Sequence, residues 1–256
     1  MILIISPSKT QDFSDSDFKI KSSIPEFLSE SKKLVRELRK LSVTQLESLM
    51  AISTNLAELN AQRFEEFSVP FSEDNAKQAL MAFKGDVYTG FDFGSYSESD
   101  FEFAQNHLRI LSGLYGMLKP LDLIQPYRLE MKTKLENERG KDLYKFWGDR
   151  PTDKLNKEFK EHKSKVLINL ASNEYFKVID KKKLDAEIIT PVFKEIKGGK
   201  AKVIAIFAKK ARGTMADYII KNKIQNPEEL KLFTGMGYTF DNELSSKNEF
   251  VFTRES

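Results

Sequence analysis

The chain has 256 residues, of which 40% are hydrophobic and 31% charged, so it is long enough for one large domain with an ordinary hydrophobic core. It contains no cysteine, which excludes disulfides, thiolate nucleophiles and cysteine-bound metal clusters. The formal net charge is only +3, and it implies a nucleic-acid partner only if the positive residues are concentrated in one patch.

The chain opens with a short apolar run, Ile2–Ile5, which is followed at once by the polar segment Ser6–Lys9. This run predicts a buried strand. It is too short for the core of a signal peptide, and nowhere do about 18 apolar residues follow one another. We therefore expect a cytoplasmic protein with no membrane partner.

The first third of the chain is predicted to be largely helical after this strand. Residues 25–40 place leucines at helical spacing behind a proline, which is favoured at the first position of a helix. Ser42–Gln45 has the pattern of a capping box at the start of a second helix. A third helix is expected over Leu56–Phe64, and a fourth is expected to be capped by Ser72 and to continue through Leu80.

The middle of the chain contains a possible DNA-binding element. A helix capped by Ser97 is expected to end at the glycine pair Gly113 and Gly116, and Pro120 is well placed to start another helix. This layout predicts a helix-hairpin-helix-like element, in which the glycines let the backbone approach a phosphate and Lys119 supplies positive charge. The alternative, an ordinary corner between two helices, remains open.

The second half of the chain is predicted to contain most of the strands. Val166–Leu170 is a continuous apolar strand, Lys197–Gly199 is a turn signal for an antiparallel hairpin, and a helix is expected to run through Ile220. Four further strands are expected at Ile188–Ile196, Lys200–Ala208, Tyr238–Phe240 and Glu249–Phe252. The predicted fold is α/β (mixed α+β), with a mixed, partly antiparallel sheet surrounded by helices in one domain over residues 1–256.

Positive charge is concentrated late in the chain. Residues 200–223 contain one acidic residue, Asp217, and seven basic residues: Lys200, Lys202, Lys209, Lys210, Arg212, Lys221 and Lys223. Lys209, Lys210 and Arg212 are predicted at a strand-to-helix turn, where backbone amides and the close approach allowed by Gly213 suit an anionic ligand. A plain solvated face is the alternative.

Two other loops contain candidate functional residues. Lys9 leaves the first predicted strand, where open α/β sheets commonly bind ligands, and Lys84 lies in a second loop rich in glycine and tyrosine. If the protein is an enzyme, the candidate catalytic residues are Asp86, Tyr127, Arg128 and Glu130, because an arginine beside a tyrosine and a carboxylate can bind an anion and position a proton donor. A structural tyrosine and a buried Arg–Glu pair would produce the same pattern.

Metal ligands are scarce in this sequence. The only histidines, His107 and His162, lie far apart, so no zinc, haem or ferritin-like iron site is expected. A carboxylate-bound Mg²⁺ or Ca²⁺ remains possible. We expect no cofactor.

Five motif segments together resemble one family. The segments are Ser6–Thr10, Ala82–Gly90, Leu111–Met131, Asn169–Tyr175 and Ala208–Gly213. In this order they resemble the YaaA family of bacterial peroxide-stress proteins, and the resemblance extends over essentially the whole chain. It implies a cytosolic protein that limits damage from free intracellular iron, binds DNA, and has its own α/β fold with a helix-hairpin-helix element.

Two functions follow as hypotheses. The first is a DNA-binding protein of the peroxide response, without redox chemistry of its own, whose partner is double-stranded or distorted DNA. The second is an enzyme acting on a nucleotide, nucleobase or other anionic small substrate. We expect one cleft to be bordered by Lys9, Lys84, Arg128, Lys209 and Arg212. A closed pocket of a few hundred Å³ would favour the enzyme, and an open groove of duplex width would favour DNA binding.

Overall fold

The central feature of the structure is a mixed β-sheet. The computed structural model describes residues 1–14 and 20–255 of the chain. The strands of the sheet are β1 (Ile2–Ile5), β5 (Leu108–Ser112), β6 (Gly116–Leu118), β8 (Val166–Leu170), β9 (Glu187–Lys197), β10 (Lys200–Lys202), β11 (Thr239–Phe240) and β12 (Glu249–Glu255). Their order is β11-β12-β9-β8-β1-β5-β6, with β10 paired to β9. The neighbours from β12 to β5 are parallel and the remaining pairs antiparallel, which confirms the predicted mixed sheet.

Helices and short strands make up the rest of the described chain. The helices are α1 (Leu28–Leu38), α2 (Val43–Met50), α3 (Thr54–Glu66), α4 (Ala79–Ala82), α5 (Glu98–His107), α6 (Leu143–Trp147), α7 (Arg150–Phe159), α8 (Asn173–Phe176) and α9 (Ala205–Lys221). Short 3-10 turns are η1 (Tyr88–Gly90), η2 (Phe93–Ser95), η3 (Pro227–Leu232) and η4 (Gly235–Gly237). Two small ladders pair β2 (Thr10–Gln11) with β4 (Phe83–Lys84) and β3 (Lys77–Gln78) with β7 (Leu123–Ile124). No helix in the described part of the chain is long and apolar enough to cross a membrane.

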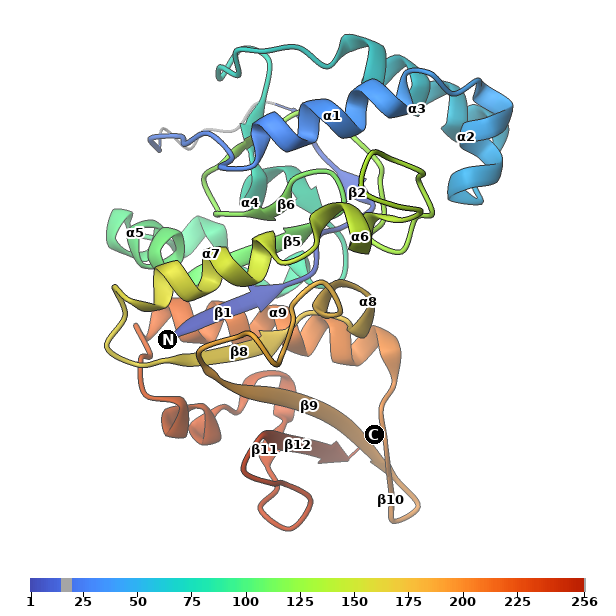
Figure 1. Cartoon of the computed structure of the whole chain (residues 1–256). Helices are drawn as coiled ribbons and strands as arrows, with labels where there is room; N and C mark the ends of the chain where they lie inside the picture. Colours follow the sequence, from blue (N-terminus) through green and yellow to red (C-terminus); the bar gives the residue numbers. More distant parts are fainter. Residues whose placement is uncertain (15–19, 256) are drawn as a thin grey trace.

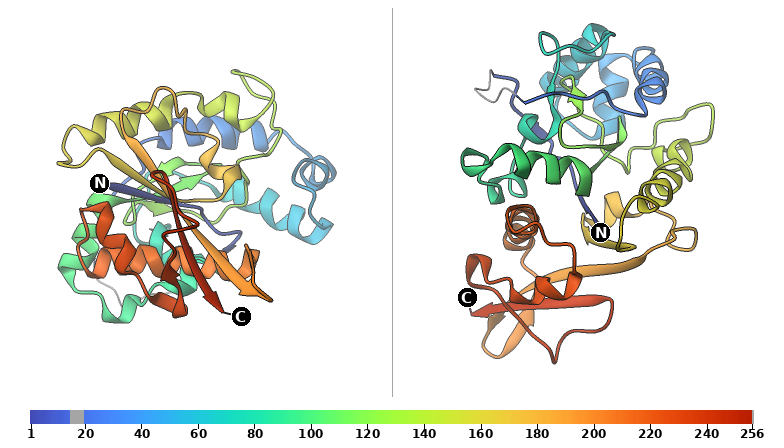
Figure 2. Two further views of the ribbon diagram at one scale, coloured as in Figure 1. Left: turned by 90° about the horizontal axis from the view of Figure 1, so that it is seen from below. Right: turned by 90° about the vertical axis from the view of Figure 1, so that its left-hand side faces the viewer.

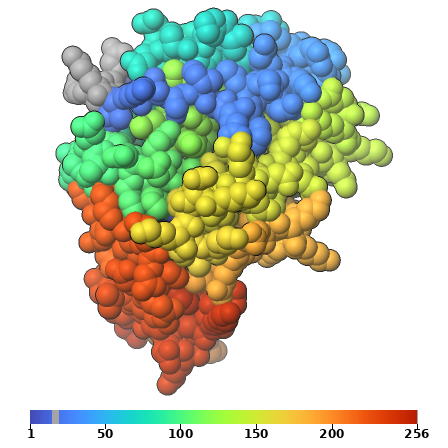
Figure 3. Space-filling model, turned by 60° about the vertical axis from the view of Figure 1, so that its left-hand side comes forward, coloured from blue at the N-terminus to red at the C-terminus, as the bar shows by residue number. Residues whose placement is uncertain are grey.

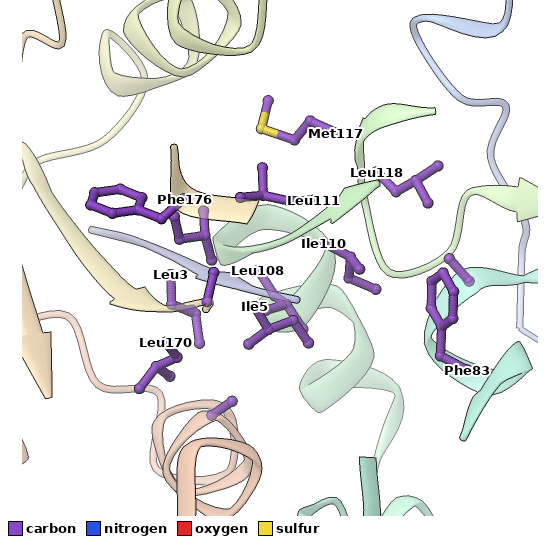
Figure 4. Packing of buried hydrophobic residues seen from close by; sticks show 14 of the residues in the cluster. Leu3, Ile5, Phe83, Leu108, Ile110, Leu111, Met117, Leu118, Leu170 and Phe176 are labelled. Carbon is purple, nitrogen blue, oxygen red and sulfur yellow. The ribbon is translucent and has the colours of Figure 1, made fainter. Parts of the chain in front are cut away.

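The sheet has helices on both faces. Helix α7 covers one face, and α5 and α9 cover the other (Figure 1; Figure 2, right). The N-terminal helices α1–α3 lie at one end of the molecule, and the C-terminal strands lie at the other (Figure 3). Parallel strands need this double cover, because both of their faces are buried. All four residues of β1 are fully buried, and Leu3 lies opposite Leu108 of β5 within the core (Figure 4).

Several local signals in the sequence are confirmed. Ser42 and Ser97 both form complete capping boxes, at the starts of α2 and α5. The turn between β9 and β10 is made by Gly198 and Gly199, which have φ values of +57° and +72°. The predicted final strand pair forms as β11 and β12. The helix predicted from Ser72 is wrong: only the four residues of α4 are helical, because the preceding Lys77 and Gln78 pair with β7 instead.

The predicted helix-hairpin-helix-like element is also wrong. Helix α5 ends at His107, and the chain continues as β5, turns through residues 113–115 and returns as the antiparallel strand β6. No helix starts at Pro120. Short apolar runs suit either a strand or a buried helix, and here pairing with β1 decides for the strand. Gly113 and Gly116 are buried: a Cβ on Gly113 would lie 2.2 Å from the carbonyl oxygen of Leu129.

The strand predicted over Lys200–Ala208 is correct only as far as Lys202. Helix α9 begins at Ala205, so Lys209, Lys210 and Arg212 lie within a helix and not in a strand-to-helix turn. The small residues Ala208 and Ala211 are buried on the face that this helix turns to the sheet. Tertiary packing therefore sets the start of the helix, since the apolar pattern from residue 203 to 208 suits both structures.

The two histidines, which are far apart in the sequence, meet in the structure. Their ring centroids are 4.8 Å apart, and His107 stacks on Phe103 at the end of α5. Desolvation by burial lowers the pKa of both imidazoles, and it lowers the pKa of His162 to about 4 from the usual 6.5. The folded protein therefore holds this pair uncharged near neutral pH.

A pH dependence of stability follows from this pair. As the pH falls from 6.5 to about 4, the unfolded chain takes up protons on its histidines before the folded chain does, so the free energy of unfolding should decrease. Replacing His162 by glutamine should flatten this decrease between about pH 6.5 and 5, where carboxylates are still ionised. Urea denaturation at several pH values measures the free energy of unfolding. An equally steep decrease with falling pH in wild type and in His162→Gln would contradict the lowered pKa of His162.

Candidate functional site

A cleft lies at the carboxyl ends of β1 and β8. Its volume is about 720 Å³. It is lined by Ser6–Thr10, Gly85–Tyr88, Glu130, Lys132, Leu170, Ser172–Tyr175, Lys209 and Arg212. In Figure 1 this is the side of the sheet where α8 lies. The carboxyl ends of parallel strands are where open α/β sheets commonly bind ligands, and the volume is within the usual range for small-molecule sites.

Hydrogen bonds between distant loops shape the floor of the cleft. Ser6 follows β1, and its hydroxyl oxygen accepts a hydrogen bond from the backbone N–H of Ser172, which follows β8, at 2.9 Å. The buried hydroxyl of Tyr88 donates to the carbonyl oxygen of Ser6 at 3.1 Å. Three loops that lie far apart in the sequence are thereby held together at the strand ends.

Close packing of two glycines brings α9 to the wall of the cleft. A Cβ on Gly213 would lie 1.7 Å from the carbonyl oxygen of Val87, and one on Gly90 would lie 2.3 Å from the backbone nitrogen of Thr214. The backbones of α9 and η1 are thus in direct contact. Gly213 was expected to allow a ligand to approach, but it allows the chain's own loop to approach instead. This contact places Lys209 and Arg212 at the cleft.

Glu130 is the centre of a charged cluster on the opposite wall. Its carboxylate lies 3.0 Å from the Nζ of Lys9 and 3.4 Å from both the Nζ of Lys132 and the guanidinium of Arg128. Burial alone would raise the pKa of Glu130, but the hydrogen bond and charge of Lys9, with Lys132, hold it below its usual value. Glu130 is therefore a carboxylate that positions cations, and it is poorly suited to donate a proton.

Arg212 differs from the other cations of the cleft. Lys209 lies 3.8 Å from the carboxylate of Asp86, but Arg212 forms no hydrogen bond or ion pair with any described residue. Its side chain is half-buried, and desolvation lowers its pKa. A half-buried guanidinium without a partner is unfavourable unless an anion binds it.

The cleft brings together only some of the predicted site residues. Of the five residues expected to border it, Lys9, Lys209 and Arg212 do so, whereas Lys84 and Arg128 are not among its lining residues. Lys84 lies beside it on β4, opposite Thr10, with its Nζ 3.7 Å from the carboxylate of Asp12.

The candidate catalytic residues are also divided. Asp86 and Glu130 line the cleft, but both are held by lysines. Tyr127 is buried, its hydroxyl lies 2.7 Å from that of Ser112, and desolvation raises its pKa. Lys210 lies on α9 but does not line the cleft. Sequence reasoning overlooked Lys132, although it directly follows the Leu111–Met131 motif.

Lys119 lies at a different place. It borders a smaller cavity of about 140 Å³, which is also lined by Arg109, Asp122, Lys154 and Glu158. Within the described residues, no group of three or more histidines, aspartates and glutamates is arranged to hold a metal ion.

Comparison with known proteins identifies the family. The family model described as peroxide stress protein YaaA matches residues 1–244. The chain belongs to this family. The match covers every residue that lines the cleft, and it confirms the resemblance given by the five motif segments. Membership of the YaaA family supports a role in the response to peroxide.

Proposed function

We propose that this YaaA-family chain acts in the peroxide response by binding double-stranded or distorted DNA, and that it thereby protects DNA from free intracellular iron without redox chemistry of its own. The support comes from a group of exposed or half-buried lysines, called here the basic arm. It comprises Lys197, Lys200, Lys202, Lys209 and Lys210, from the β9–β10 hairpin and the first turns of α9.

The observation that carries this proposal is that four of the five lysines of the basic arm have no ion-pair partner among the described residues. Among the described residues only Lys209 has an ion-pair partner, Asp86, and that pair is long at 3.8 Å. Lys221 and Lys223, from the same basic stretch of sequence, differ because both are paired with Asp100. Unpaired lysines on an exposed hairpin suit the regular negative charge of DNA phosphates.

Apolar side chains beside the basic arm support distorted DNA as the partner. Val203, Ile204 and Ile206 are 53%, 40% and 48% exposed, directly after β10. Apolar residues among lysines are typical of proteins that contact unstacked or kinked base steps. Figure 1 shows the β9–β10 hairpin projecting from the body of the molecule, so a duplex has access to it.

The link to iron follows from the condensed cations around DNA. Ferrous ions belong to this counterion layer, and lysines that neutralise phosphates release the cations held there. Hydroxyl radicals formed from peroxide and iron would then arise away from the bases. Protection of this kind requires binding but no chemical step by the protein.

Charge removal from the hairpin tests the proposal. Replacing Lys197, Lys200 and Lys202 together by glutamine should weaken duplex binding and reduce the slope of log affinity against log salt by up to about 2.7, since each lost phosphate contact lowers it by about 0.9. The loss of affinity should be the same for all DNA sequences, because contacts to phosphates do not distinguish the bases. Fluorescence anisotropy over a salt series measures both quantities.

The matched control removes the same charge elsewhere. Lys157, Lys160 and Lys163 are exposed on and after α7 and have no ion-pair partner among the described residues. Their triple glutamine variant should keep the salt slope of the original protein. Equal slopes for the original protein and the arm variant, with the fold intact, would reject DNA binding by the arm.

The second candidate function, an enzyme acting on a nucleotide, nucleobase or other anionic small substrate, is favoured by one specific observation. The cleft is a pocket of about 720 Å³, which suits a small molecule better than a duplex. Asp86 and Glu130 are the two candidate catalytic residues at its wall. Product analysis of nucleotides incubated with the protein tests this alternative.

A further inference from the structure

We infer that the cleft binds a small organic phosphate, with Arg212 as the anchor of the phosphate group and a sugar or nucleoside as the rest of the ligand. This site shares only Lys209 with the basic arm, and the inference does not depend on DNA binding. Three features of the cleft support it: the state of Arg212, the rigidity of the wall that carries Arg212, and the chemistry of the remaining lining.

The first support is the state of Arg212. Arg212 lines the cleft, is half-buried, and has no partner among the described residues, whereas every other cation that lines the cleft has a carboxylate within 4 Å. A planar guanidinium binds a phosphate through two parallel hydrogen bonds. The structure therefore leaves one cation of the cleft available for an anion.

The second support is the rigidity of the wall that carries Arg212. The contact between Gly213 and the Val87 carbonyl oxygen fixes the helix turn next to Arg212, and the contact between Gly90 and the Thr214 backbone fixes the turn after it. Arg212 thus projects from a helix that cannot withdraw from the cleft without separating these backbones. Such preorganisation favours binding, because little side-chain and loop order is lost when the ligand arrives.

The third support is the chemistry of the remaining lining. Hydroxyl groups come from Ser6, Ser8 and Thr10, and the loop that carries them is packed against Gly85. Hydroxyls and lysines suit phosphate oxygens, and the carboxylates of Asp86 and Glu174 can accept hydrogen bonds from the hydroxyls of a sugar. A phosphate alone would leave most of the 720 Å³ unfilled. The mixed lining therefore indicates a phosphate monoester with a hydroxylated body.

Calorimetric titration of the full chain with AMP and with adenosine tests this inference. Wild-type protein should bind AMP in a saturable manner, and adenosine at least about tenfold more weakly, since hydrogen bonds to a charged group contribute strongly. Replacing Arg212 by glutamine should weaken AMP binding by at least about tenfold, and lysine at this position should restore part of it. The melting temperature of Arg212→Gln should equal or exceed that of wild type, because the variant removes a desolvated charge.

The matched control is Lys210→Gln, which removes a charge two residues away on α9 without touching the cleft. It should leave AMP affinity within about twofold of wild type, as should the triple variant of the basic arm. The inference is wrong if wild type shows no saturable AMP binding, if AMP and adenosine bind equally, or if Lys210→Gln weakens binding as much as Arg212→Gln. The inference would also be wrong if wild type bound no AMP while Arg212→Gln lost affinity for DNA. Arg212 would then contact a DNA phosphate and not a small organic phosphate.

Discussion

Replacing Trp147 by alanine should lower the free energy of unfolding by about 3–5 kcal/mol, because the change leaves a large cavity in the core. Trp147 is fully buried, and its ring packs against Gly116 and lies 5.8 Å from the ring of Phe27. Its indole N–H donates to the carbonyl oxygen of Gly113 at 2.9 Å, so the variant also leaves a buried acceptor without its donor. Urea denaturation measures the loss.

Phenylalanine at position 147 is the control for this change. Phenylalanine keeps an aromatic ring in the cavity, so it should lower the free energy of unfolding clearly less than alanine does, although the hydrogen bond to Gly113 is lost. The salt dependence of the proposed DNA binding should be unchanged in the folded variants, because Gly113 and Gly116 support the core at this point. A stability loss below about 1 kcal/mol for Trp147→Ala would contradict this packing role.

Replacing Gly213 by alanine should destabilise the protein by about 3 kcal/mol, at the upper end of the range for overpacking. The new Cβ would lie 1.7 Å from the carbonyl oxygen of Val87, and backbone atoms cannot rotate away as a side chain can. Helix α9 or the Asp86–Tyr88 loop must therefore move. Since this contact places Arg212, AMP binding should be lost along with the stability.

Gly94 provides the matched control for Gly213. It is exposed, has no positive φ, and a Cβ added there would meet only the carboxylate of Asp92, at 3.7 Å. Gly94→Ala should change the stability by less than about 0.5 kcal/mol, as is usual for surface substitutions. Thermal denaturation of both variants makes the comparison. If Gly213→Ala unfolds at the same temperature as Gly94→Ala, the backbone contact between α9 and η1 is not the constraint described.

Local signals in the sequence predicted their structures well. The capping boxes at Ser42 and Ser97 and the turn at Gly198 and Gly199 form as expected, because each depends on hydrogen bonds or φ angles within a few residues. The apolar run Ile2–Ile5 forms the buried strand β1. Such features need no information about distant parts of the chain.

Segments whose pattern suits two structures were predicted less well. Residues 108–112 were assigned to a helix, but they form the strand β5. Residues 203–208 were assigned to a strand, but the helix α9 begins among them. For β5 the decisive partner is β1, to which Leu108, Arg109 and Ile110 are paired across more than a hundred residues of sequence. Periodicity cannot contain that information.

The candidate site shows the same division. The sequence by itself determined which residue types are present: serines after the strand β1, the basic residues of α9, and no cysteine. Only the tertiary structure decided that Ser6 meets Ser172, 166 positions away, and that Arg212 lines the cleft with no partner in the described part of the chain. The physical reason is that local hydrogen bonding and periodicity act over a few residues. The alignment of parallel strand ends and the contact of two glycine backbones depend on how the whole core packs.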